Sequence, residues 1–131
     1  ETVTLGSGGV NLATTTAISV AHAESVALSL AQFAIGDWNL ARHEPMQLAT
    51  TGAPCAMCFG AVPWSGVKSL VCGASKQDAE AAGFDEGHKP DDWANSLQRR
   101  GIVVQCGVLQ AEAAAVLATY KASGGAIYNA D

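Results

Sequence analysis

Residues 46–74 read MQLATTGAPCAMCFGAVPWSGVKSLVCGA, and the order of the elements predicted in this segment indicates the fold class. Met46–Thr51 predicts a short strand that glycine and proline end, and Ser69–Ala74 predicts a buried strand. Between them, Cys55–Trp64 predicts a helix that Pro54 opens and a glycine stops. A strand, a helix and a strand in this order favour two parallel strands joined by a crossover helix.

The rest of the chain continues this alternation. Upstream, Val3–Val10 predicts a modest strand, Asn11–Ser19 a loop, and Ala21–Ala34 a helix with one apolar face. Downstream we expect a short helix, a loop, a second helix, a strand and a long Ala-rich helix, in this order: Asp78–Ala82, Gly83–Lys89, Asp91–Arg100, Ile102–Val108 and Ala111–Ala122. The alternation predicts an α/β protein with a three-layer α/β/α domain, whose sheet is largely parallel beyond its first hairpin.

Length and composition limit the classes of protein that fit. The chain has 131 residues, about half of them apolar and 15% charged, which suits one globular domain. No apolar run approaches the ~20 residues that span a bilayer, so we expect no membrane partner. The net charge is −5 and the basic residues are scattered, which disfavours a nucleic-acid partner. Two of the four cysteines form Cys-x-x-Cys, which favours metal or redox chemistry and a cytoplasmic location.

Two short motifs carry the chemistry, each at the start of a predicted helix. His22 opens one helix, while Cys55 and Cys58 lie at i and i+3 on the first turn of the other, so both sulfurs point to the same side. The positive end of that helix favours thiolate over thiol. One imidazole and two thiolates are three zinc ligands, which leave a fourth position open, as catalytic zinc sites require.

Glu24 follows His22 by two residues and is predicted to be the proton carrier. Zinc lowers the pKa of a bound water towards ~7, and a neighbouring carboxylate can take the proton and hand it on. A His-x-Glu motif followed by Pro-Cys-x-x-Cys is the pattern of zinc deaminases, which attack the carbon that bears an amino group.

Other interpretations of these residues stay open. Cys-x-x-Cys alone also fits a redox dithiol, and a structural zinc site would need a fourth ligand close by. The remaining cysteines, Cys72 and Cys106, lie in apolar strand patterns and are interpreted as buried structural residues. His43 and His88 lie in polar loops and are interpreted as surface histidines.

The sequence resembles the bacterial guanine deaminases of the cytidine deaminase-like superfamily, including a type that also accepts the triazine ammeline. Four segments carry the resemblance over nearly the whole chain: AHAESVALSLAQ, PCAMCFGAVPWSGVKSLVCGAS, GFDEGHKPDDW and GGAIYNA. The resemblance implies a cytidine deaminase-like fold with a mixed five-stranded sheet and one Zn2+ per chain. It also implies that guanine and water give xanthine and ammonia.

The resemblance also implies roles for single residues. Asn11 matches the asparagine that hydrogen-bonds the purine, and Glu24 matches the proton shuttle to the ring. Glu86 matches the second acid, which contacts the purine and helps carry a proton to the leaving amine. Trp64 resembles the aromatic wall of the pocket. The remaining substrate-contacting positions are Ala23, Phe84 and Asp85.

Each of these positions also has a simpler interpretation. Asn11 beside two glycines fits a turn residue. Asp85 and Glu86 fit a solvated acidic pair, although a carboxylate could accept from both the ring N–H and the amine of guanine. Trp64 and Phe84 fit core aromatics, the usual fate of such side chains.

The family carries a helix and a first strand ahead of Val3, so we expect 1–131 to be one zinc-dependent deaminase domain that is N-terminally truncated. The resemblance further implies a homodimer whose C-terminal tails can exchange between subunits, and it places Tyr128 near a pocket, its own or that of a partner subunit. Other candidate substrates are ammeline, guanosine or another nucleoside, cytosine and adenine. A tRNA adenosine deaminase and a non-catalytic zinc protein of this fold are the lower alternatives.

Overall fold

The computed structural model describes residues 7–130, in which three strands form one parallel sheet in the order β1-β2-β3. The strands are β1 (Gln47–Gly52), β2 (Ser69–Ala74) and β3 (Val103–Gln105). All three were predicted, but β3 is shorter than expected. The chain beyond β3 turns out of the extended conformation, because Gly107 and Leu109 both have positive φ.

The N-terminal prediction differs from the structure. Val3–Val10 was expected to be a strand; residues 3–6 lie outside the described part, and residues 7–10 form no strand. The expected loop contains one helical turn, α1 (Ala13–Thr16), which starts where the Asn11 side chain accepts a hydrogen bond from the Ala13 N–H at 3.0 Å. The first hairpin and a five-stranded sheet are therefore not found within residues 7–130.

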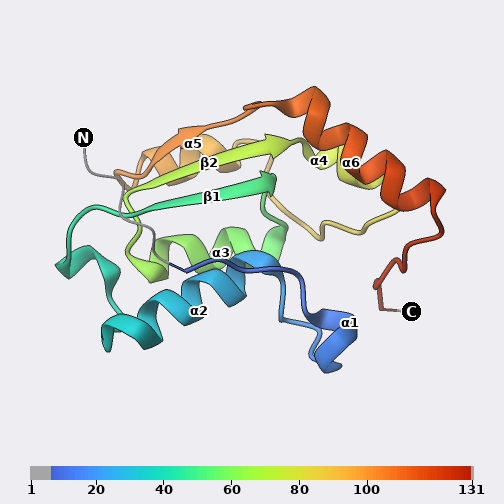
Figure 1. Ribbon diagram of the computed structural model, residues 1–131. Helices are drawn as coiled ribbons and strands as arrows, with labels where there is room; N and C mark the ends of the chain where they lie inside the picture. Colours follow the sequence, from blue (N-terminus) through green and yellow to red (C-terminus); the bar gives the residue numbers. More distant parts are fainter. Residues whose placement is uncertain (1–6, 131) are drawn as a thin grey trace.

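Helices cover both faces of the sheet, as Figure 1 shows. One face carries α2 (Ala23–Ile35), α3 (Ala56–Ser65) and α5 (Trp93–Gln98). On the other face α6 (Gln110–Ala122) packs against β2, with α4 (Lys76–Ala81) beside it. The predicted α/β/α layering is confirmed.

The larger core lies between the sheet and α2, α3 and α5. Its buried side chains are Leu28, Leu40, Leu48, Val62, Val67, Leu70, Leu97 and Ile102. On the opposite face β2 presents Gly73 to α6: a Cβ there would lie 2.8 Å from the Thr51 carbonyl oxygen and 3.0 Å from the Ala113 Cβ. Only glycine permits this close approach of α6 to the sheet.

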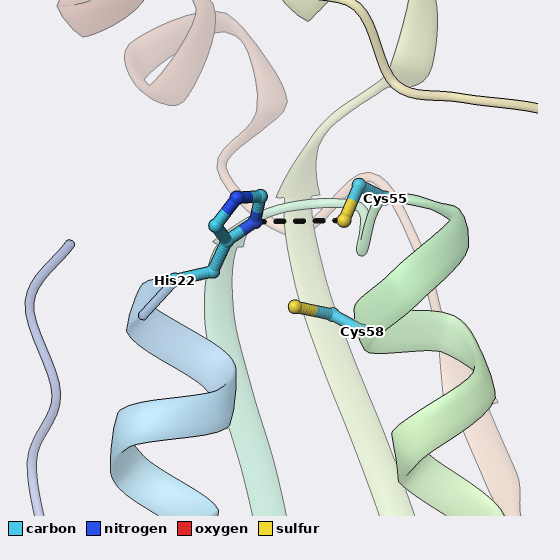
Figure 2. A group of neighbouring side chains, drawn as sticks. All are labelled: His22, Cys55 and Cys58. Carbon is cyan, nitrogen blue, oxygen red and sulfur yellow. Dashed lines mark hydrogen bonds between the residues drawn. The ribbon is translucent and has the colours of Figure 1, made fainter. Parts of the chain in front are cut away.

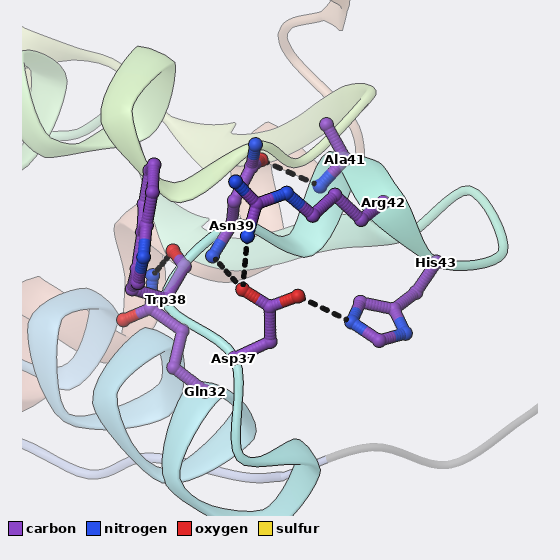
Figure 3. A network of polar contacts seen from close by, with 7 residues as sticks. All are labelled: Gln32, Asp37, Trp38, Asn39, Ala41, Arg42 and His43. Carbon is purple, nitrogen blue, oxygen red and sulfur yellow. Dashed lines mark hydrogen bonds and ion pairs between the residues drawn. The ribbon is translucent and has the colours of Figure 1, made fainter.

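Polar contacts fix the turn between α2 and β1 (Figure 3). The Asp37 carboxylate accepts from the Asn39 N–H at 2.9 Å and pairs with Arg42 at 3.2 Å and His43 at 3.1 Å. The Asn39 hydrogen bond is the main reason that the pKa of Asp37 is lowered. His43 is therefore a surface residue, as predicted, and its ring stabilises this turn through the contact with Asp37.

Within residues 7–130, no helix combines the length and the hydrophobicity that a membrane span requires.

Candidate functional site

Two helix N-termini bring the three predicted metal ligands together. His22 is the N-cap of α2 and Cys55 the N-cap of α3, both with extended backbone, and Cys58 lies one turn into α3. Neither N-cap side chain makes a capping hydrogen bond to its own helix, so the imidazole and the thiol are free to face each other. Figure 2 shows the ring and the two sulfurs facing one another across the gap between the helices.

The distances fit a zinc ion. One ligand atom from each of His22, Cys55 and Cys58 lies within 4.8 Å of the others, and the Cys55 Sγ lies 3.5 Å from the His22 Nδ1. Zn–N and Zn–S bonds of ~2.0–2.3 Å in a tetrahedron separate nitrogen and sulfur by about 3.6 Å. The chemistry of the donors and their spacing therefore both suit zinc, and three ligands leave room for a fourth.

The pKa values of the two thiols shift in opposite directions. A hydrogen bond from Cys58 lowers the pKa of Cys55 to about 5, and backbone N–H groups of the first turn of α3 add to this. The same hydrogen bond raises the pKa of Cys58. Cys55 is thus ready to bind a metal as thiolate, while Cys58 loses its proton as it binds, so metal affinity rises with pH.

Glu24 lies directly beside this cluster. The Cys58 thiol donates to the Glu24 carboxylate at 3.6 Å, and burial raises the pKa of Glu24. A carboxyl group whose proton is held more tightly than usual, next to a metal ligand, is suited to accept and return a proton.

Glu86 reaches the same region from the loop after α4. Its carbonyl oxygen accepts from the Ala56 N–H at 2.9 Å, which ties the loop to the first residue of α3. Burial, followed by the negative charge of Cys55, raises the pKa of Glu86 to about 7. Two half-buried carboxyl groups, Glu24 and Glu86, therefore flank the three ligands.

The C-terminal segment forms another part of the site's surroundings. The Asn11 amide donates to the Tyr128 hydroxyl at 2.8 Å, and the Tyr128 ring meets the His22 ring edge-on at 6.1 Å. Phe84 lies between Tyr128, with ring centroids 5.0 Å apart, and Tyr120, at 6.0 Å. Asn11, Phe84 and the tail thus lie together next to a metal ligand.

The other residues predicted to contact the substrate lie at different distances from the metal ligands. Ala23 lies between His22 and Glu24 as the first residue of α2. The Asp85 carboxylate is exposed and turned back on its own loop, where it accepts from the Gly87 N–H at 2.8 Å. Trp64 lies in the last turn of α3, at the opposite end from Cys55, and is 85% exposed. The structure does not bring Trp64 to the metal ligands.

The structure differs from the sequence interpretation at Cys106 and Lys89. Cys72 is buried as expected, but Cys106 is exposed, because the chain has left β3 by this position. Lys89 had no predicted role, yet it is buried and donates to the Pro54 carbonyl oxygen at 2.6 Å. Its place in a polar loop gave no signal of this contact, which spans 35 residues of sequence.

The fold and the ligand cluster define a zinc-binding deaminase domain. The chain matches the family described as the cytidine and deoxycytidylate deaminase zinc-binding region over residues 4–74, more than half of its length, and it belongs to this family.

Known proteins of this family are similar to the chain. It is 37% identical to a guanine deaminase of Bacillus subtilis (strain 168) over 78 residues, 60% of this chain and 48% of that protein. It is 44% identical to a tRNA-specific adenosine deaminase of the same strain over 64 residues, 49% of this chain and 38% of that protein. The chain thus spans less than half the length of either relative.

Solved structures of similar proteins have the same fold. The structure of a guanine deaminase from Nitrosomonas europaea has a TM-score of 0.85 and 46% identity, covering 87% of this chain and 64% of that chain. The protein NE0047 in complex with 2,6-diaminopurine has a TM-score of 0.87 and 48% identity, covering 92% of this chain and 65% of that chain.

Proposed function

We propose that the protein hydrolyses guanine to xanthine and ammonia at a zinc site formed by His22, Cys55 and Cys58. The observation that carries the proposal is the Glu24 carboxyl group, 3.6 Å from a ligand sulfur, beside three ligands that leave a fourth position open. Similarity to guanine deaminases supports the substrate, as do the relatives crystallised with 8-azaguanine and 2,6-diaminopurine, two close analogues of guanine.

The side chains of this protein divide the proton transfers. Zinc supplies Lewis-acid activation of the attacking water. Glu24 takes the proton that the water loses and delivers it to a ring nitrogen, a step that its raised pKa favours. Glu86, whose pKa is raised to about 7, passes a proton to the exocyclic amine, which leaves as ammonia. The second proton of the water, released as the new carbonyl forms, restores the proton of Glu86. One water enters, the C–N bond breaks and a C–O bond forms, so that the atoms balance.

The remaining residues would orient the base. Asn11 supplies an amide that can hydrogen-bond the purine, and Phe84 supplies an aromatic face beside it. Ala23 and the exposed Asp85 complete the predicted contacts. The Tyr128 hydroxyl already bonds the Asn11 amide, so the C-terminal segment would border the bound base.

Trp64 is not assigned to the substrate pocket of its own chain. Its ring is 85% exposed in the last turn of α3, at the opposite end of the helix from Cys55. The proposed pocket therefore depends on Phe84 for its aromatic contact.

A substrate panel tests the proposal. Ammonia release from guanine, ammeline, guanosine, cytosine and adenine would be measured with zinc-loaded protein, together with a tRNA carrying a target adenosine. We expect guanine to be the best substrate, with ammeline as a side activity. Preference for guanosine would indicate a pocket open towards ribose, and activity on tRNA alone would replace the proposal with an RNA-editing function.

A further inference from the structure

Lys89 is the one charged side chain among the buried residues of the described core. Its relative exposure is 5%, its Nζ donates to the Pro54 carbonyl oxygen at 2.6 Å, and it lies 4.4 Å from the centroid of the Trp93 ring. Lysine is almost never fully buried unless it is paired, and here the carbonyl and the aromatic face supply the partners.

The position of this contact matters because Pro54 precedes the ligand Cys55. The loop that carries Lys89 touches α3 a second time, where the Glu86 carbonyl accepts from the Ala56 N–H at 2.9 Å. The same loop therefore holds the residue before Cys55 and the residue after it.

Gly87 shows how closely the loop and the helix approach. Its φ is +74°, and a Cβ at this position would lie 3.1 Å from the Ala56 Cβ. An additional methyl group would strain the backbone and press the loop away from the start of α3.

We propose that Lys89 is a positioning residue of the zinc centre, which holds the backbone just before Cys55 and keeps the loop that carries Glu86 against the start of α3. The inference relies on the zinc site of the proposed function, but it does not depend on the substrate. Residues that orient metal ligands without touching the metal typically change metal affinity or activity ~10–100-fold when they are mutated. The charge of Lys89 also opposes the increase in the pKa of Glu86 that burial causes.

Zinc release tests the inference without any substrate. Lys89→Met keeps the length of the side chain and its packing on Trp93 but removes the donor and the charge. Lys68→Met, at an exposed position, is the matched control. Zinc-loaded proteins would be mixed with a chromogenic chelator. We expect Lys89→Met to release zinc at least about tenfold faster than wild type, Lys68→Met to match wild type, and Lys89→Arg to be intermediate because it keeps a cationic donor.

A second variant covers the case in which Lys89→Met does not fold. Gly87→Ala changes an exposed loop residue, so the core stays intact, and we expect it also to release zinc faster than wild type. If Lys89→Met folds and releases zinc at the wild-type rate, the inference is overturned. If Lys89→Met does not fold, zinc release from Gly87→Ala at the wild-type rate overturns it. A wild-type protein that holds no zinc would instead contradict the proposed function, and zinc binding without guanine turnover would contradict only its substrate.

Discussion

At the scale of single residues, two carboxyl groups flank the zinc ligands, and burial is the main reason that both hold their protons tightly. Glu24 lies on α2 next to Cys58, whereas Glu86 arrives on a loop and reaches a pKa of about 7. A group with this pKa can both give and take a proton at neutral pH, which general acid–base catalysis favours.

Replacing Glu86 tests its role. We expect Glu86→Gln to keep zinc and fold but to lower kcat on guanine by ~10²–10⁴, because the amide cannot deliver the proton to the leaving amine. Glu80→Gln, in an exposed position on α4, is the control and should leave kcat unchanged. Steady-state ammonia release measures both, and equal rates for Glu86→Gln and wild type would remove Glu86 from the mechanism.

The metal ligands could be predicted from sequence because two short motifs, His-x-Glu and Pro-Cys-x-x-Cys, together match a known ligand pattern. Within the second motif, Cys55 and Cys58 are one helical turn apart, so their sulfurs lie on one side. Lys89 could not be predicted, because no motif links it to its hydrogen-bond partner 35 residues away. The Asn11–Tyr128 contact, 117 residues apart, likewise depends on how the tail packs.

At the scale of elements, α4 is fixed by a capping box. The Ser75 hydroxyl accepts from the Asp78 N–H at 3.1 Å, and the Asp78 carboxylate accepts from the Ser75 N–H at 2.8 Å and from Gln110 of α6 at 3.0 Å. The hydrogen bond from the Ser75 N–H is the main reason that the pKa of Asp78 is lowered. The loop that bears Glu86 follows α4 directly, so this cap stabilises the segment that leads into the site.

The lowered pKa of Asp78 predicts a pH dependence of stability. The carboxylate stabilises the fold above its unfolded pKa, near 3.8, and this contribution is lost as pH falls through the lower folded value. Asp78→Asn should therefore be less stable than wild type at pH 7, and the difference should shrink towards pH 3. Thermal midpoints measure this. Asp91→Asn, at an exposed position, is the control, and a deficit that did not change with pH would contradict the prediction.

The elements themselves were largely predictable. β2 matches its predicted range, and α2, α3 and α6 differ by a residue or two at their ends, because apolar periodicity and glycine stops are local signals. β3 and α5 are shorter than predicted; beyond β3, Gly107 and Leu109 take positive φ, which ends the strand without changing its apolar pattern. The single turn of α1 depends on one asparagine side chain and has no periodicity to detect.

At the scale of the whole molecule, large apolar side chains lie exposed on the single chain. Phe33 is 88% exposed, Trp64 85% and Trp38 68%. Aromatic side chains are enriched at protein interfaces, and the homodimer stays a prediction. Tail exchange also stays a prediction: in the single chain the tail is bound to its own loop, where Asn129 bonds the backbone of Asp85 and Gly83.

In the proposed mechanism, the Glu24 carboxyl group moves the proton of a water activated between three zinc ligands. Ammonia release from guanine by zinc-loaded Glu24→Gln tests this role, with zinc measured in the same sample. We expect one zinc per chain and a rate lower than that of wild type by ~10²–10⁴. A Glu24→Gln protein that holds its zinc and turns over guanine at the wild-type rate would contradict it.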